Sequence, residues 1–311
     1  MTPAIVRSFV TEQHSPNSSL YLLLDPMADC ATDDPLHVQA LRQTLGDKAL
    51  TRVPRPDLAH TPQACPVLVT LATPAVKPQE HLLSLSALRA KEDEGRSRRY
   101  VCGWLSSAAT PTTVASHLIT LGQLPQAAEN HFFPVYEPLR LELLAATLNH
   151  GETGNWWPIE QWLFPASSGA SALLIGQPDK GVAFGPLAAD VQLDAALVSS
   201  LLGAWRNALE LPVTYAPARW QGSTLLPAQA AAQAYKQIRK ARQLGLKKHQ
   251  DIVILALHHW MLHSNLHEHM DIRLLIDRAV QHGTSLSSLF APINDASWQR
   301  IVSDLTAGAH R

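Results

Sequence analysis

The chain has 311 residues, a formal net charge of -1 at pH 7, and charged side chains at only 16% of its positions. So small a charge argues against a protein held on nucleic acid or on an anionic membrane mainly by its overall electrostatic field. Cys30, Cys65 and Cys102 are an odd number, lie far apart and form no CxxC pair, so neither a disulfide framework nor a zinc knuckle is expected. The length favours two lobes over a single core.

Neither a signal peptide nor a membrane-spanning helix is expected. Glu12, Gln13 and His14 interrupt the apolar run that ends at Val10. No uninterrupted apolar stretch approaches the roughly 20 residues that a membrane helix needs. We therefore expect a cytoplasmic protein, in a reducing compartment, with no membrane among its partners.

Short apolar runs alternate with helical patterns up to about residue 175. After the first run, residues 27–45 contain no glycine, so no phosphate-binding loop for a dinucleotide cofactor is expected there. Alternation of this kind favours an α/β lobe, with a partly parallel sheet and flanking helices. The expected strands cover residues 21–25, 66–71, 100–105 and 171–175, and the expected helices cover residues 80–96 and 111–122.

The composition changes after this region. Residues 176–186, GQPDKGVAFGP, form a connection rich in glycine and proline, and helical periodicity dominates the remainder of the chain. We therefore expect a boundary near residue 186, with the α/β lobe at 1–185 and an all-α lobe at 186–311. The expected helices of the second lobe cover residues 191–209, 227–244, 251–262, 268–281 and 295–305.

The stretch 131–165 concentrates aromatic, proline and charged residues. Three of the eight tryptophans fall within seven of its residues. Glu137 is placed as the N-cap and Pro138 as the first residue of a helix that is expected to end near Gly151. Dense aromatic residues often form core, but a charge beside a helix start and bulky rings is also typical of protein interfaces. The candidate protein-binding residues are Phe132, Phe133, Tyr136, Glu137, Pro138, Arg140, Trp156, Trp157 and Trp162.

Within this stretch, the sequence suggests a division of roles. Phe133 and Trp162 are expected to pack in the core together with the leucines of the helix. Tyr136, Glu137 and Arg140 are expected to contact a partner.

A histidine cluster offers an enzymatic alternative. His259, His263 and His267 have i, i+4, i+8 spacing, as metal ligands on one helix face would, and Glu268 lies nearby. However, the order is not HExxH, and Ser264 and Asn265 are expected to end the helix before His267. A metal-dependent or hydrolytic enzyme therefore stays an alternative, while the favoured interpretation assigns no catalytic residue, metal or cofactor.

A basic run offers a second alternative. The run contains no acid and could contact phosphate groups through Lys236, Arg239, Lys240, Arg242, Lys247 and Lys248. The segment after them, ILALHHW, is largely apolar, whereas readout of bases needs polar side chains on the second helix. The solvated face of an amphipathic helix is the favoured interpretation, and no nucleic-acid partner is expected.

The order of motifs resembles a known family. YLLLD, CPVLVTL, CGWLSS, FFPVYEPLRLELL and WWPIEQWLFP, spread over residues 21–165, resemble the adaptor/chaperone family of bacterial type VI secretion, domain of unknown function 4123. The matching residues are Phe133, Tyr136, Pro138, Pro158 and Trp162. The chain departs from the family pattern at Pro134 and Leu139, where arginine is usual, and at Glu137, where aspartate is usual.

This resemblance implies an intracellular adaptor without catalytic residues or cofactors. Such a protein binds a toxic effector and promotes its loading onto the VgrG spike before secretion. The expected partners are therefore the cognate effector and VgrG.

Overall fold

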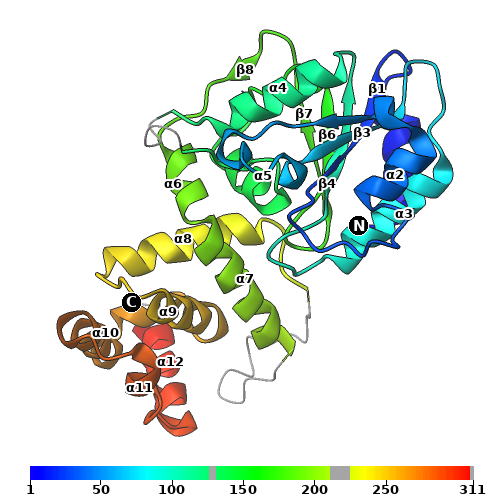
Figure 1. Ribbon diagram of the computed structural model, residues 1–311. Coiled ribbons are helices and arrows are strands. Elements are labelled where there is room, and N and C mark those ends of the chain that lie inside the picture. Colours follow the sequence, from blue (N-terminus) through cyan, green and yellow to red (C-terminus); the bar gives the residue numbers. More distant parts are fainter. Residues whose placement is uncertain (126–130, 211–224, 309–311) are drawn as a thin grey trace. The chain divides into compact units, whose positions relative to one another are not determined.

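A computed structural model describes residues 1–125, 131–210 and 225–308 (Figure 1). The chain divides into two units, Met1–Ala195 and Ala196–Arg311. This division lies beyond the expected residue 186 because helix α6 (Leu187–Leu193) belongs to the first unit. There Ala188 and Ala189 are buried in the same core as Trp156.

A six-stranded sheet organises the first unit. Every neighbouring pair in this sheet is antiparallel. The predicted partly parallel sheet is therefore wrong for the main sheet, and parallel pairing among the described residues is confined to the short strands β5 (Thr153–Gly154) and β8 (Gly181–Val182). In sheet order, the six strands are β2 (Leu50–Arg52), β3 (Val67–Ala72), β1 (Ser19–Leu24), β4 (Val101–Ser107), β6 (Gln161–Pro165) and β7 (Ser171–Ile175).

The central strands β3, β1 and β4 are almost wholly buried because helices cover the sheet on both faces. In β1, Leu22 and Leu24 belong to the core on one face, whereas Tyr21 and Leu23 belong to the core on the other. A strand buried on both sides reads as a continuous apolar run in either orientation. The run therefore predicts burial but not strand direction.

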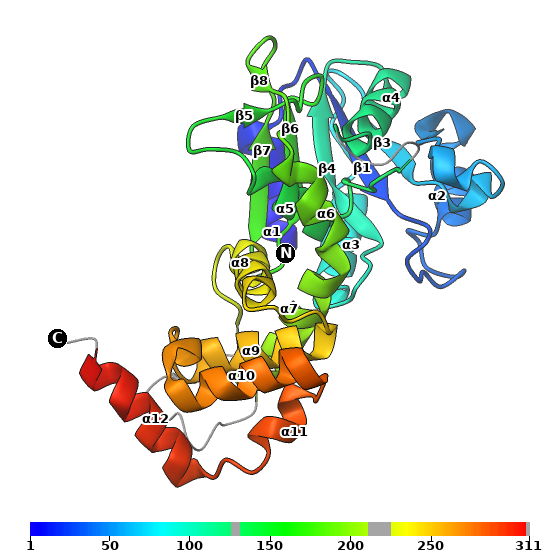
Figure 2. The ribbon, with the colours of Figure 1, turned by 90° about the vertical axis from the view of Figure 1, so that its left-hand side faces the viewer.

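Helices from opposite ends of the unit cover the two faces. One face carries α1 (Pro3–Ser8), the single π-helical turn η1 (Phe9–Gln13), α2 (Val38–Leu45) and α3 (Glu80–Glu92). The other face carries α4 (Pro111–Gly122), α5 (Pro138–Ala145) and α6. Figure 2 turns the sheet so that β7 stands at one margin and β6, β4, β1 and β3 follow across the view.

The local signals for α4 and α5 are confirmed at the start of each helix. The Thr110 hydroxyl accepts a hydrogen bond from the backbone N–H of Thr113, and α4 spans Pro111–Gly122 as expected. Helix α5 begins at Pro138 but ends at Ala145, earlier than expected. The Thr147 hydroxyl donates to the carbonyl of Leu144 at 2.7 Å and closes the last turn.

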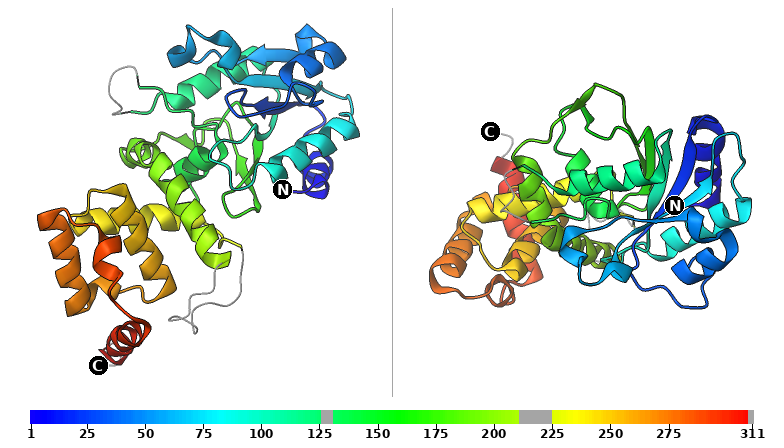
Figure 3. Two further views of the ribbon diagram at one scale, coloured as in Figure 1. Left: turned by 60° about the horizontal axis from the view of Figure 1, so that its bottom comes forward. Right: turned by 45° about the horizontal axis from the view of Figure 1, so that its top comes forward.

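Helices are the regular secondary structure of the described part of the second unit, as expected. Asp251 Oδ1 accepts the backbone N–H of Leu286 at 2.8 Å and thereby ties α9 to α11. The path of the chain through these helices can be followed in Figure 3. The helices are α7 (Ala195–Glu210), α8 (Ala230–Gln243), α9 (His249–Met261), the 3-10 turn η5 (Leu266–Glu268), α10 (Met270–His282), α11 (Leu286–Phe290) and α12 (Asp295–Gly308).

In the described ranges, no single helix has both the length and the apolar character needed to cross a membrane. The bent pair α6 and α7 meets those two criteria only when its helices are taken together.

Candidate functional site

The aromatic residues of the central stretch form core rather than surface. Tyr136 and Trp162 are 0% exposed, and Phe132, Phe133 and Trp156 are also buried in the core between the sheet and α4 and α5. Their rings cannot contact a partner in this structure. The expected packing role of Phe133 and Trp162 agrees with this burial, whereas the contact role expected of Tyr136 does not.

A buried arginine explains how the Tyr136 hydroxyl is satisfied. Arg55 Nη1 donates to Tyr136 Oη at 2.6 Å, and its Nε and Nη2 donate to the two carboxylate oxygens of Asp57 at 3.1 and 2.6 Å. The guanidinium also lies 5.3 Å from the centroid of the Phe132 ring. Burial raises the pKa of Tyr136 well above its usual value, so the phenol stays protonated.

The carboxyl group of Asp25, directly after β1, is also buried. Its Oδ1 accepts the backbone N–H of Met27 at 3.0 Å, while Oδ2 has no hydrogen-bond partner among the described residues. Burial, with a smaller contribution from the negative charge of Glu137, raises the pKa of Asp25 to about 6. This site therefore holds a carboxyl group that exchanges a proton near neutral pH.

Glu137 and Arg140 are engaged within the unit. Arg140 Nε donates to Glu137 Oε2 at 3.1 Å, and Arg140 Nη1 donates to the backbone carbonyl of Gln192 at 2.9 Å. The buried Gln192 side chain returns a bond from Nε2 to the Arg140 carbonyl at 2.9 Å. Both charged residues are half-buried, and Pro138 is buried. The expected contact pair therefore fastens α5 to α6.

The serines at the end of β4 do not form a hydrolytic site. Ser106 Oγ lies 2.8 Å from His14 Nδ1 but is fully buried. The nearby Glu160 accepts from the Ser18 hydroxyl at 2.7 Å and from the Ala108 N–H at 3.2 Å, so both of its oxygens are engaged in fixing the chain. A nucleophile must be reachable by substrate, and its base must be oriented by a third group.

The histidine cluster brings two of its members together. The rings of His259 and His267 are 5.1 Å apart in a T-shaped arrangement, and His259 Nδ1 lies 2.9 Å from Gln237 Oε1. Across the described ranges, no three His, Cys, Asp or Glu side chains are grouped so that they could hold a metal ion. Burial first, and then the charge of Lys240, lowers the pKa of His259 to about 3. The geometry describes a neutral, packed histidine pair.

The basic residues within α8 lie on one face of the helix, as expected of an amphipathic helix. Ala231, Ala234 and Ile238 are buried on the opposite face, whereas Lys236 and Arg239 are exposed.

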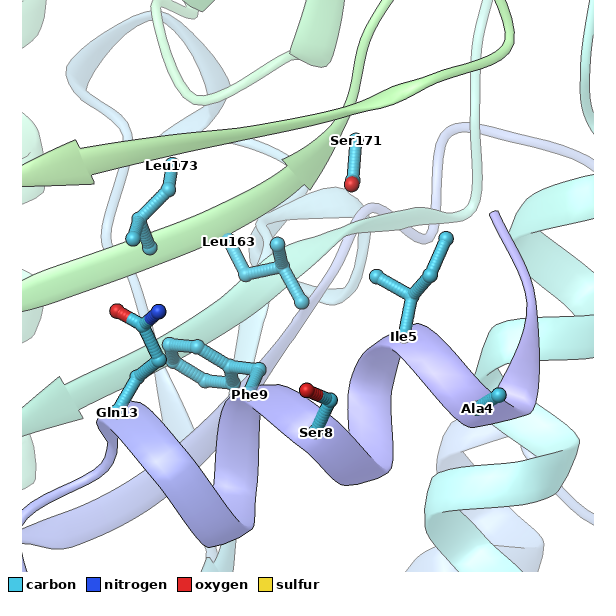
Figure 4. A pocket seen from close by; sticks show the side chains of 8 residues that line it. All are labelled: Ala4, Ile5, Ser8, Phe9, Gln13, Leu163, Ser171 and Leu173. Carbon is cyan, nitrogen blue, oxygen red and sulfur yellow. The ribbon is translucent and has the colours of Figure 1, made fainter.

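An apolar groove lies between the N-terminal helical segment and the margin of the sheet (Figure 4). It has a volume of about 440 Å³ and no charged side chain among its lining residues. Ile5 and Phe9 line it from α1 and η1, and Leu163 and Leu173 line it from β6 and β7. Sequence reasoning missed this groove because it assigned no helix to residues 3–13, although PAIVRSFV carries an apolar periodicity.

Trp157 is the member of the central stretch that lies at the surface beside this sheet margin. Its side chain is 39% exposed, and that of Ile175, the last residue of β7, is 49% exposed. The backbones meet closely, because a Cβ atom added at Gly176 would lie 3.0 Å from the backbone nitrogen of Trp157. Two large apolar side chains are thus accessible at one end of β7.

Comparison with known proteins found no matching family model, curated protein or solved structure. Any functional assignment therefore depends on the residues and surfaces described above.

Proposed function

We propose that the chain is a non-catalytic adaptor that binds a secreted effector polypeptide and promotes its loading onto a VgrG spike of type VI secretion. The motifs over residues 21–165, with their resemblance to adaptor/chaperones, suggest the biological setting. The observation that carries the proposal is the exposure of Trp157 and Ile175 together at the end of β7. The other tryptophans and phenylalanines of the central stretch are buried.

The chemistry of this surface suits a polypeptide better than a small polar substrate. Tryptophan is among the residues most enriched at the hot spots that dominate binding energy in protein interfaces. The neighbouring groove is lined by apolar side chains, with Ser8, Gln13 and Ser171 as its polar members. An adaptor that shields an aggregation-prone segment needs such a surface and needs no nucleophile, base or metal.

The proposal also accounts for the charged residues of the central stretch. Glu137 and Arg140 hold α5 against α6, and Arg55 holds Tyr136. These contacts fix α5 against α6 and hold Tyr136 in the core, so these residues are not free to bind a partner.

Co-expression tests the proposal. The chain, the effector and the VgrG protein encoded nearest to its gene are produced together, and a complex is expected to persist through gel filtration. Replacing Trp157 by alanine is expected to weaken effector binding by about 2 kcal/mol, or roughly 30-fold, as for an aromatic hot spot.

Leu88→Ala is the matched control, because Leu88 is 47% exposed on α3 and lies outside the proposed surface. It should bind the effector as the unaltered chain does. If neither the effector nor VgrG is retained by the unaltered chain, the adaptor function is wrong. If Trp157→Ala and Leu88→Ala bind equally well, the surface is misplaced.

A further inference from the structure

Strand β7 forms an edge of the six-stranded sheet, and its outward backbone groups can be identified from the pairing. The backbone N–H of Gly176 donates to Glu160 O at 2.9 Å, and that of Ala166 donates to Ala170 O at 2.9 Å. These bonds fix the residues that face β6, since antiparallel pairs alternate between hydrogen-bonded and non-bonded. The residues whose N–H and C=O groups point away from β6 are Ser171, Leu173 and Ile175.

These outward groups have no partner within the described part of the chain. No hydrogen bond joins the outer edge of β7 to another described segment. Such a row of donors and acceptors, repeating every second residue, is complementary to another extended chain. A strand edge of this kind is satisfied either by water or by an added strand.

The two edges of the sheet are protected to different degrees. The β2 edge is only three residues long, ends in the charged Arg52 and is followed by Pro54. These features discourage pairing with a foreign strand. Strand β7, SALLI, is five residues long and contains neither a charge nor a proline, and its pairing with β6 shows no register shift.

The apolar groove lies on one face of this open edge. Leu173 pairs directly with Leu163, and both line the groove with Phe9 and Ile5 (Figure 4). Every second side chain of a strand added to β7 would point toward that face. The edge and the groove together therefore select a segment that is extended, uncharged on one face and apolar at alternate positions.

We propose that β7 binds such a segment of the partner polypeptide as a seventh strand of the sheet. The added strand is hydrogen-bonded to Ser171, Leu173 and Ile175, and its apolar side chains fill the groove beside Phe9. This inference rests on the proposed adaptor function and names the part of the effector that is recognised. It places Trp157 beside the end of the added strand.

Residue-resolved amide exchange is the direct test. In the complex of the intact chain with its effector, the amides of Leu173 and Ile175 are expected to exchange at least about tenfold more slowly than in the free chain, because each gains a backbone hydrogen bond. The amide of Leu174 already faces β6 and serves as the internal control.

Two substitutions at one position separate the backbone from the side chain. Ile175→Ala shortens the apolar side chain and keeps the backbone N–H group. Ile175→Pro also replaces the isoleucine side chain, but it removes the N–H group. The Ile175 N–H makes no bond within the sheet, so proline is tolerated there. Ile175→Pro is expected to bind the effector about tenfold more weakly than Ile175→Ala, as the loss of a backbone hydrogen bond implies. Far-ultraviolet circular dichroism verifies that each variant is folded.

The outcomes distinguish the two proposals. A stable complex in which the Leu173 and Ile175 amides exchange as in the free chain overturns strand addition and leaves the adaptor function standing. The absence of any complex overturns both. Slow exchange in the chain alone that depends on its concentration identifies a second copy as the occupant and also overturns the proposal.

Discussion

Asp25 shows how one buried carboxyl group makes stability depend on pH. Its folded pKa, raised by burial to about 6, exceeds the ordinary value of 3.8 that we take for the unfolded chain. Between these values the folded state keeps the proton and the unfolded state has lost it. Stability therefore falls as pH rises from 4 to 6, and above pH 6 the full penalty of about 3 kcal/mol is present.

Replacing Asp25 by asparagine should remove this penalty, because an amide stays neutral at every pH. We expect Asp25→Asn to raise the free energy of unfolding by as much as about 3 kcal/mol at pH 7.5 and to change it little at pH 3.5. Urea unfolding at the two pH values measures this difference. Asp33→Asn, at an exposed site, is the control. A gain that is equal at both pH values would contradict the proton-linked explanation.

Tyr136 supports a second prediction about a single residue. Tyr136→Phe deletes the oxygen that accepts from Arg55 Nη1 and is expected to lower the free energy of unfolding by about 2 kcal/mol, since a charged donor loses its buried acceptor. Tyr21→Phe deletes a neutral bond to the Ala109 carbonyl and is expected to cost about 1 kcal/mol. Thermal unfolding compares the two variants. Equal losses would show that Asp57 alone satisfies the guanidinium.

The sequence could not predict the bond from Arg55 to Tyr136, because 81 positions separate the two residues along the chain. Tyr136 was singled out, but its neighbours Glu137 and Arg140 made it look like a contact residue. Arg55 lies in a short proline-rich segment with no periodicity of its own. The fold brings this segment against residues 131–137. Only this contact shows that the Tyr136 ring belongs to the core.

At the scale of elements, apolar runs and helix-start signals were informative. Runs at residues 21–25, 66–71, 100–105 and 171–175 correspond to β1, β3, β4 and β7, and Thr110 and Pro111 mark the start of α4. Strand direction could not be predicted, because it depends on the partner that each strand meets. The turn at Gly169, with φ of 84°, makes β6 and β7 an antiparallel hairpin.

The groove also belongs to this scale, since it exists only where two distant elements meet. Residues 3–13 bring Ile5 and Phe9 against Leu163 and Leu173, far along the chain. A short N-terminal helix covers too few turns for its apolar periodicity to be recognised. The sequence therefore did not reveal the groove. Trp157 was included among the candidate residues only because the stretch 131–165 is rich in aromatic residues.

At the scale of the whole molecule, buried titratable groups make the stability of each unit depend on pH. In the first unit, Asp25 favours folding as pH falls from 6 to 4, whereas burial lowers the pKa values of His14 and His117, which weakens folding as pH falls. In the second unit, burial lowers the pKa values of His258, His259 and His267. The first unit therefore holds groups that act in both directions, whereas these three histidines of the second unit weaken folding as pH falls.

His259 provides the test at this scale. Its folded pKa of about 3 lies below the ordinary value of 6.5, so its contribution to stability is present above pH 6.5 and is lost as pH falls toward 3. At pH 5 this histidine is protonated in the unfolded chain and neutral in the folded one. The free energy of unfolding is therefore about 2 kcal/mol lower at pH 5 than at pH 7 from this one histidine. We expect the opening free energy of α9 amides to fall by at least this amount between pH 7 and pH 5.

Native-state amide exchange of the intact chain measures this loss. His259→Gln keeps a polar partner for Gln237 and should reduce the loss in α9 by about 2 kcal/mol. His282→Gln, at an exposed position in the last turn of α10, should leave it unchanged. A loss in α9 that His259→Gln does not alter would contradict this assignment and point to other groups, such as His258 and His267, whose pKa values burial also lowers.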